Sequence, residues 1–175
     1  MNALVVYESM YGNTAQIAAA IGDGLRDGGF ETIVAPLDDV EPARVSEVAL
    51  LVVGGPTHAH SMSRTSTREQ ARADEKNTYE EPTDDPGLRD WMDSLPDGDG
   101  HLGAAFDTRF HAPRALTGSA AKGIAQRLHK RGFRPAGGPG SFLVTKQNTL
   151  EDGELERARA WAREIAERSA VVSNT

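Results

Sequence analysis

Segment 8–14 holds the first residues of the chain whose types and spacing could do chemistry. It follows an apolar run, Leu4–Tyr7, and leads into a helical pattern that starts at Asn13. A loop from a strand into a helix directs backbone N–H groups and the positive end of the helix dipole toward one point, which suits a phosphate. The sequence therefore predicts an anion site in which neutral donors act alone, because no Lys or Arg precedes Arg26. Its members are Ser9, Met10, Tyr11, Gly12, Asn13 and Thr14.

Two later loops also end apolar strands and carry polar or aromatic side chains. One contains Pro56, Thr57, His58 and Ala59, and the other contains Asp107, Thr108, Arg109 and Phe110. In an open parallel sheet, ligands bind at the carboxyl ends of the strands, where the strand order reverses. We therefore expect the three loops to meet at one site.

His58 and His60 raise a metal alternative. Two histidines two residues apart on an extended segment point the same way, and His101, Asp107 or His111 could complete a site. No carboxylates stand at a recognisable spacing beside them, so we favour an interpretation without a metal.

Strand and helix patterns alternate along the chain. Strands are expected at 4–7, 30–36, 48–53, 101–106 and 133–145, the last interrupted at 136–140; helices are expected at 13–27, 87–95, 116–130 and 152–169. This alternation predicts an α/β fold, a five-stranded parallel sheet covered by helices on both faces. We expect one domain over 1–175 with a polar insertion at about 61–86, either a lid beside the site or a surface loop.

Composition excludes several classes of protein. The chain has 175 residues, a net charge of −7 and no cysteine, so disulfides, thiolate metal sites and dithiol chemistry are excluded. No apolar run is long enough to span a membrane, and the start of the chain lacks signal-peptide features, so we expect a cytoplasmic protein. Residues 108–150 hold eight basic and no acidic residues. They suggest a polarised molecule, whereas the acidic overall charge argues against nucleic-acid binding.

The pattern from Val5 to Ile21 resembles the flavodoxin signature. The matching residues are Val5, Val6, Tyr7, Ser9, Gly12, Thr14, Ala18 and Ile21, and the likeness continues at 55–57, 141–144 and 153–155. The resemblance is to the flavodoxin-like family, the FMN-binding domains of the flavodoxin and nitric oxide synthase type. It implies a doubly wound, three-layer sandwich with strand order 2-1-3-4-5 and a bound FMN. By this likeness, residues 9–14 would hold the FMN phosphate, and 56–59 and 107–110 would contact the ribityl chain and ring.

The same resemblance implies a redox protein that carries electrons through its flavin to a redox partner protein. A small FMN-dependent oxidoreductase that binds NAD(P)H or a quinone over the ring is an alternative, and Arg64, Arg109 and Arg114 could then bind a nucleotide phosphate. A flavin-free interaction module is a third possibility. Catalytic residues and the oligomeric state are open at this stage.

Overall fold

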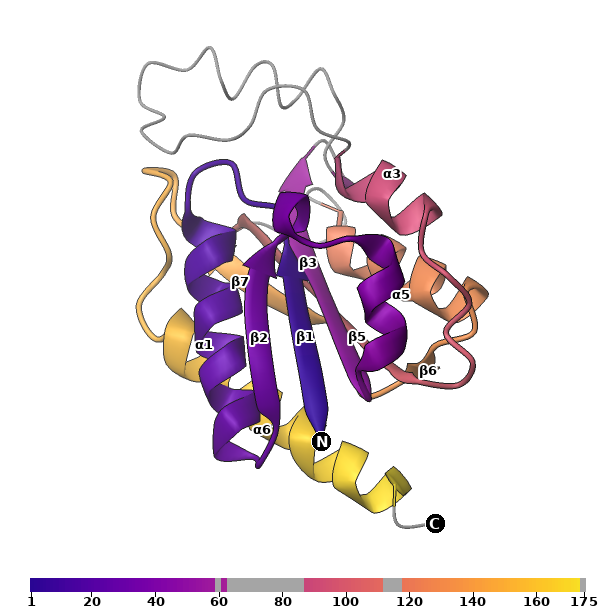
Figure 1. Cartoon of the computed structure of the whole chain (residues 1–175). Helices are drawn as coiled ribbons and strands as arrows, with labels where there is room; N and C mark the ends of the chain where they lie inside the picture. The colour runs from indigo at the N-terminus through magenta and orange to yellow at the C-terminus, as the bar shows by residue number, and fades with distance from the viewer. Residues whose placement is uncertain (59–60, 63–86, 112–117, 174–175) are drawn as a thin grey trace.

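The computed structural model describes residues 1–58, 61–62, 87–111 and 118–173. Within these ranges it forms one twisted sheet with helices on both faces (Figure 1). Ala59, Arg64, Arg114 and most of the expected insertion at 61–86 lie outside the described residues, so the predictions made for them stay predictions.

The sheet has the strand order expected from the sequence. Strands β2 (Glu31–Pro36), β1 (Asn2–Tyr7), β3 (Leu50–His58) and β5 (Leu102–Phe110) lie side by side in that order, all parallel. The last expected strand is split into β6 (Arg134–Pro135) and β7 (Gly140–Val144), and both pieces pair in parallel with β5. Counting β5 as the fourth expected strand and β6 with β7 as the fifth, the expected order 2-1-3-4-5 is confirmed. A two-residue strand β4 (Ser61–Met62), which pairs antiparallel with β3, was not predicted.

Two pairs of helices cover the sheet. Helices α1 (Asn13–Asp27) and α6 (Glu154–Ser173) pack on one face, and α3 (Leu88–Asp93) and α5 (Ala120–Lys130) pack on the other. Neighbouring strand residues supply both cores, because successive side chains of a strand point to opposite faces. Val5 lies in the core under α1 and α6, whereas Leu4 and Val6 lie in the core under α3 and α5. Two 3₁₀ turns, η1 (Leu37–Asp39) and η2 (Pro42–Glu47), connect β2 to β3.

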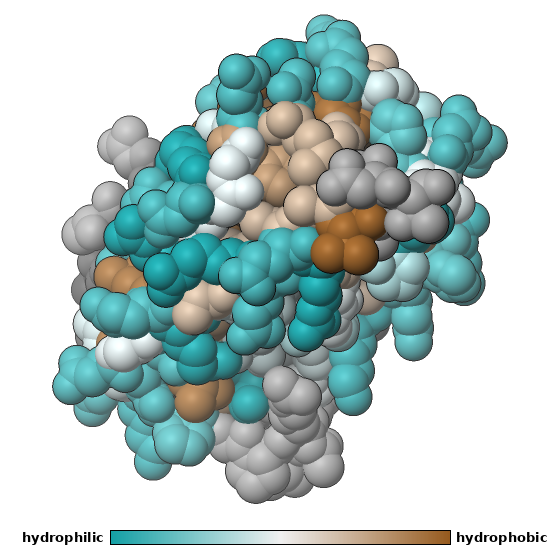
Figure 2. All heavy atoms as spheres, turned by 90° about the horizontal axis from the view of Figure 1, so that it is seen from below, coloured by the Kyte–Doolittle hydropathy of each residue, from teal (hydrophilic) through white to brown (hydrophobic). Residues whose placement is uncertain are grey.

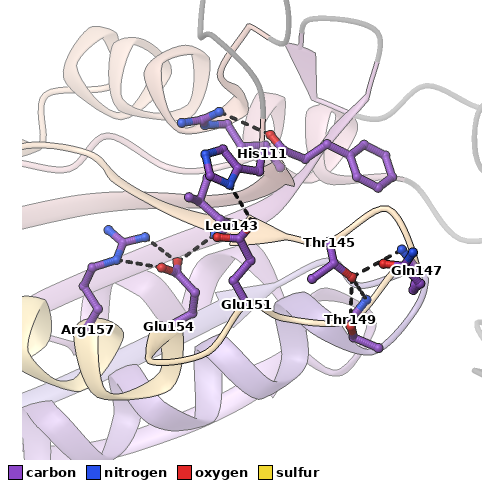
Figure 3. A network of polar contacts seen from close by, with 10 residues as sticks. His111, Leu143, Thr145, Gln147, Thr149, Glu151, Glu154 and Arg157 are labelled. Carbon is purple, nitrogen blue, oxygen red and sulfur yellow. Dashed lines mark hydrogen bonds and ion pairs between the residues drawn. The ribbon is translucent and has the colours of Figure 1, made fainter.

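The outer edge of β7 is closed by the chain that follows it (Figure 3). The Leu143 N–H donates to Glu154 Oε2 at 2.7 Å, and the Leu143 carbonyl accepts from the Glu151 N–H at 3.0 Å. These bonds occupy polar groups that an edge strand otherwise leaves open to a second chain. Helix α6 starts at Glu154, two residues after the expected start, and Leu155 in its first turn is 41% exposed.

The carboxyl ends of the strands gather at one end of the sheet, while both chain termini lie at the opposite end (Figure 1). Figure 2 looks at that opposite end, where a paler, weakly hydrophobic centre is surrounded by hydrophilic residues. The three segments predicted to form a site therefore lie at the end away from the termini. Only the first is a loop: residues 56–58 and 107–110 are the last residues of β3 and β5, which run further than the expected ends at 53 and 106. No helix among the described residues is long and apolar enough to cross a membrane.

Candidate functional site

The loop between β1 and α1 leaves the helix N-terminus open. Gly12, the residue before α1, is in the left-handed region with φ 80°, and it has no side chain of its own to cap the helix. The first turn of α1 contains no acidic residue. Ser9 is buried, and its Oγ accepts from the Ala15 N–H at 3.3 Å. The partial positive charge of the helix end is therefore not neutralised by a carboxylate of the helix itself.

The buried hydroxyl of Thr14 joins this first loop to β5. Its Oγ1 lies 2.8 Å from Thr108 Oγ1, and both side chains are almost completely buried. Since Pro56 pairs with Thr108 in the β3–β5 ladder, the three predicted loops meet at this edge of the sheet. Met10 is also buried, and Tyr11 and Pro56 are half-buried.

A fourth segment, residues 145–149, lies beside the start of α1. Asn13 Nδ2 donates to the Asn148 carbonyl at 3.0 Å and to Asn148 Oδ1 at 3.2 Å. The segment is held as a compact turn by the Thr145 and Thr149 hydroxyls, 2.9 Å apart (Figure 3). The Thr149 hydroxyl therefore bonds within the turn.

Asp107 has a more interior position than the sequence indicated. Its side chain has no exposed surface, and it accepts hydrogen bonds from Thr57, Ser119, Ser141 and the Ala121 N–H. Asp107 thus connects β3, β5 and β7 with the start of α5.

Arg109 and Phe110 diverge at the end of β5. Arg109 Nε donates to Ser141 Oγ at 2.9 Å, whereas Phe110 is 53% exposed. Phe110 borders an open groove of about 640 Å³, whose other lining residues are His111, Val144, Thr145, Lys146 and Glu151. Across this groove His111 Nδ1 lies 2.7 Å from Glu151 Oε1 (Figure 3). Arg109 is bonded to Ser141, so of Arg109 and Phe110 it is Phe110 whose side chain is exposed to a planar ligand.

His101 and His111, two of the histidines suggested as metal ligands, lie at opposite ends of β5. His101 precedes β5 at the opposite end of that strand from His111, and its Nδ1 lies 2.8 Å from the Val48 carbonyl oxygen. The backbone of His58 ends β3, and His60 lies outside the described residues. Among the residues that the structure describes, no three His, Cys, Asp or Glu side chains gather as a metal site would require.

Three arginines of the 108–150 block are held by neighbouring groups. Arg131 donates to the Leu95 and Asp93 carbonyls, Arg134 donates to the Gly100 carbonyl at 2.7 Å, and Arg127 lies 3.9 Å from Asp93. Much of this basic block therefore connects α5 and the following turn to the segment after α3.

Four polar residues at this end of the sheet were not predicted as part of the site. Ser119 caps α5, a role that its position before an apolar helical pattern could have suggested. Buried Glu8 accepts from the Leu88 N–H at 3.3 Å and so holds the start of α3. Asn148 has a positive φ of 62°. Ser141 lies within an apolar strand, and no local pattern distinguishes it.

Comparisons with known proteins agree with this geometry. The flavodoxin family model matches residues 5–90, and no curated protein sequence matches the chain. Among solved structures, a flavodoxin from the domain Archaea is 24% identical, with 97% of this chain and 99% of that one covered and a TM-score of 0.68. Oxidised flavodoxin 1 from Bacillus cereus is 20% identical, with 95% and 98% covered and a TM-score of 0.69. A flavodiiron core from Synechocystis is 16% identical; 98% of this chain but 36% of that one is covered, with a TM-score of 0.61.

A doubly wound parallel sheet whose strands lie in the order 2-1-3-4-5 along the chain defines the flavodoxin-like class of α/β proteins. The chain has this flavodoxin-like fold, and the flavodoxin family model matches it over residues 5–90.

Proposed function

We propose that this protein binds FMN and transfers electrons to and from redox partner proteins. The observation that carries the proposal is the start of α1, which follows Gly12, has no acidic residue in its first turn, and is joined to β5 by the Thr14–Thr108 hydroxyl pair. The loop fits a terminal phosphate monoester, because Gly12 lets the backbone approach closely and the helix end favours an anion. The match to the flavodoxin family supports FMN as the phosphate-bearing group.

The proposed roles divide between the two ends of the cofactor. Backbone N–H groups of residues 9–14, with the Ser9 and Thr14 hydroxyls, would bind the phosphate. Residues 56–59, Thr108 and the exposed ring of Phe110 would contact the ribityl chain and the flavin ring. The flavin supplies the electron-transfer chemistry when bound, while the chain binds it, orients it and limits its contact with water.

The bonds of Arg109 also favour a carrier. Arg109 is bonded to Ser141 and to the Phe110 carbonyl, so it stabilises the end of β5 in place of binding a nucleotide phosphate. No other described feature favours a nucleotide-dependent enzyme over a carrier.

Titration of the apoprotein with FMN, riboflavin and FAD tests the phosphate assignment. We expect FMN to bind much more tightly than riboflavin, which lacks the phosphate, and we expect FAD not to bind. The double variant Gly12→Val/Thr14→Ala should lose FMN, because the valine crowds the loop and the alanine removes a donor near the anion.

Ser169→Ala is the matched control. It also removes a buried hydroxyl, but one that donates to the Ile165 carbonyl within α6, so FMN binding should be unchanged. Equal affinity of the wild-type protein for riboflavin and FMN, or full FMN occupancy in the double variant, would contradict the phosphate assignment.

A further inference from the structure

The Asp107 carboxylate is the centre of a buried cluster that joins three strands to a helix. Asp107 Oδ2 accepts from Thr57 Oγ1 at 3.1 Å, Ser119 Oγ at 2.8 Å and the Ala121 N–H at 2.9 Å. Its Oδ1 accepts from Ser141 Oγ at 2.6 Å. Both carboxylate oxygens are thus occupied by donors of the protein, and the side chain has no exposed surface.

The cluster also fixes where α5 begins. The Ala120 N–H donates to Thr57 Oγ1 at 2.9 Å, the Ala121 N–H donates to Asp107, and the Lys122 N–H donates to Ser119 Oγ at 3.3 Å. Each of the first three amides of the helix therefore has a side-chain acceptor. A buried carboxylate is costly unless it is well hydrogen-bonded, and the N-terminus of a helix is a favourable place for it.

Thr57 belongs both to this cluster and to the segment proposed to contact the flavin ring, residues 56–59. It donates to Asp107, accepts from the start of α5, and stands one residue before His58 at the end of β3. Asp107 therefore joins the end of β3 to the start of α5. The phosphate loop, by contrast, makes none of the four bonds to the Asp107 carboxylate.

We propose that Asp107 is a positioning residue for the ring end of the cofactor site. It holds the end of β3, at Thr57, against the start of α5 and does not contact the cofactor with its side chain. This inference rests on the proposed FMN function, and it replaces the direct contact that the sequence suggested for the Asp107 side chain. Its consequence is that Asp107 controls affinity for the flavin ring and leaves phosphate recognition unchanged.

The test compares FMN with riboflavin, which share the ring and differ in the phosphate. Asp107→Asn replaces one carboxylate oxygen with an NH₂ group, so at least one of the four donors loses its acceptor. Thr57→Val removes the hydroxyl at nearly constant volume. Measured where circular dichroism shows each apoprotein folded, each variant should lower affinity for both flavins by the same factor, about tenfold or more. Amide exchange at Ala120 and Ala121 should become faster.

A double variant separates positioning from direct contact. If Asp107 acts through Thr57, Asp107→Asn/Thr57→Val should weaken binding little more than either change alone; additive losses would overturn the proposal. So would wild-type affinity in Asp107→Asn, or a loss confined to FMN.

Glu154→Gln is the control, because Glu154 is also a buried carboxylate that accepts from a backbone N–H, at Leu143. Glu154→Gln should change the stability of the protein but leave its affinities for FMN and riboflavin unchanged. Absence of flavin binding by the wild-type protein would instead refute the proposed function itself.

Discussion

Thr14 and Thr108 show how one hydrogen bond can serve both the fold and the site. Their hydroxyls lie 2.8 Å apart, and each side chain is almost fully buried although the residues are 94 positions apart in the sequence. A hydroxyl buried without a partner costs free energy, so each residue constrains what the other can be. The bond holds the first turn of α1 against the end of β5, the two elements on which the proposed phosphate and ring contacts stand.

Thr108→Val should lower the free energy of unfolding by about 1–2 kcal/mol, because Thr14 would keep a buried hydroxyl without its partner. Urea denaturation of the apoprotein measures this. Thr108→Ser keeps the hydroxyl and loses only a methyl group, so it should be clearly more stable than Thr108→Val. Equal stability of the two variants would show that the hydroxyl pair contributes nothing.

The residues of the first loop were predictable because they are contiguous and follow a recognisable strand. The partners of Asp107 were not, since Thr57, Ser119 and Ser141 lie 50, 12 and 34 positions away and meet only once the sheet has formed. A carboxylate after a strand looks the same in the sequence whether it faces a ligand or the interior. Its burial depends on the packing of α5, which a local pattern does not encode.

Helices α1 and α6 pack closely because small residues face each other. A Cβ added to Gly24 would lie 2.3 Å from the Arg159 carbonyl oxygen, and one added to Gly28 would lie 2.3 Å from Ala166 Cβ. The periodicity of α1 predicted its bounds, Asn13–Asp27, as the structure has them. It did not predict which helix would lie against these glycines, because that depends on the chain returning to the same face of the sheet 130 residues later.

Gly28→Ala should therefore destabilise the protein, by about 1–3 kcal/mol, since extra volume in a packed interface forces neighbours to shift. The Gly28 backbone, with φ −83° and ψ 8°, accepts alanine without strain, so the loss would come from contact with α6. Ala166→Gly removes the opposing methyl group. In thermal or urea unfolding, the double variant should lose less stability than the two single losses added together. Strict additivity would contradict the contact.

An ion pair joins the same two helices and makes part of their packing depend on pH. Arg159 donates to Asp27 at 2.6 and 2.9 Å, and this hydrogen bonding lowers the Asp27 pKa from its ordinary value of 3.8. A carboxyl whose pKa is lower in the folded protein stabilises the fold above its unfolded pKa, and that contribution is lost as the pH falls through the folded pKa.

Asp27→Asn should reduce the unfolding temperature slightly at neutral pH, and its difference from the wild-type protein should shrink as the pH falls below 3.8. The effect should be modest because the pair is exposed to solvent. Asp23→Asn, which removes the exposed pair with Arg26 inside α1, is the control and should have little effect at any pH. A constant difference between Asp27→Asn and wild type across this range would exclude the ion pair as the cause.

At the scale of the whole molecule, the strand order places every proposed contact at one end of the sheet and both termini at the other (Figure 1). Exposed carboxylates lie beside the proposed site, at Asp39 and Glu41 after β2 and at Asp90 on α3. These segments are packed together, since Trp91 Nε1 donates to the Val40 carbonyl at 2.8 Å. We call these three residues the acidic rim. In a chain of net charge −7, the rim would attract a basic redox partner toward the flavin.

Neutralising the acidic rim with Asp39→Asn/Glu41→Gln/Asp90→Asn should slow electron transfer to cytochrome c, a basic redox protein, about tenfold or more at low ionic strength. The effect should fade toward 0.15 M salt, where charges more than about 8 Å apart are largely screened. Stopped-flow measurement of the second-order rate constant tests this. The control, Glu156→Gln/Glu164→Gln/Glu167→Gln on exposed positions of α6, changes the net charge equally but away from the rim, and should have a much smaller effect. Ferricyanide, an anion, should react faster with the rim variant than with the wild-type protein. Equal slowing by both triple variants would mean that total charge steers the partner, and the rim would have no particular role in docking.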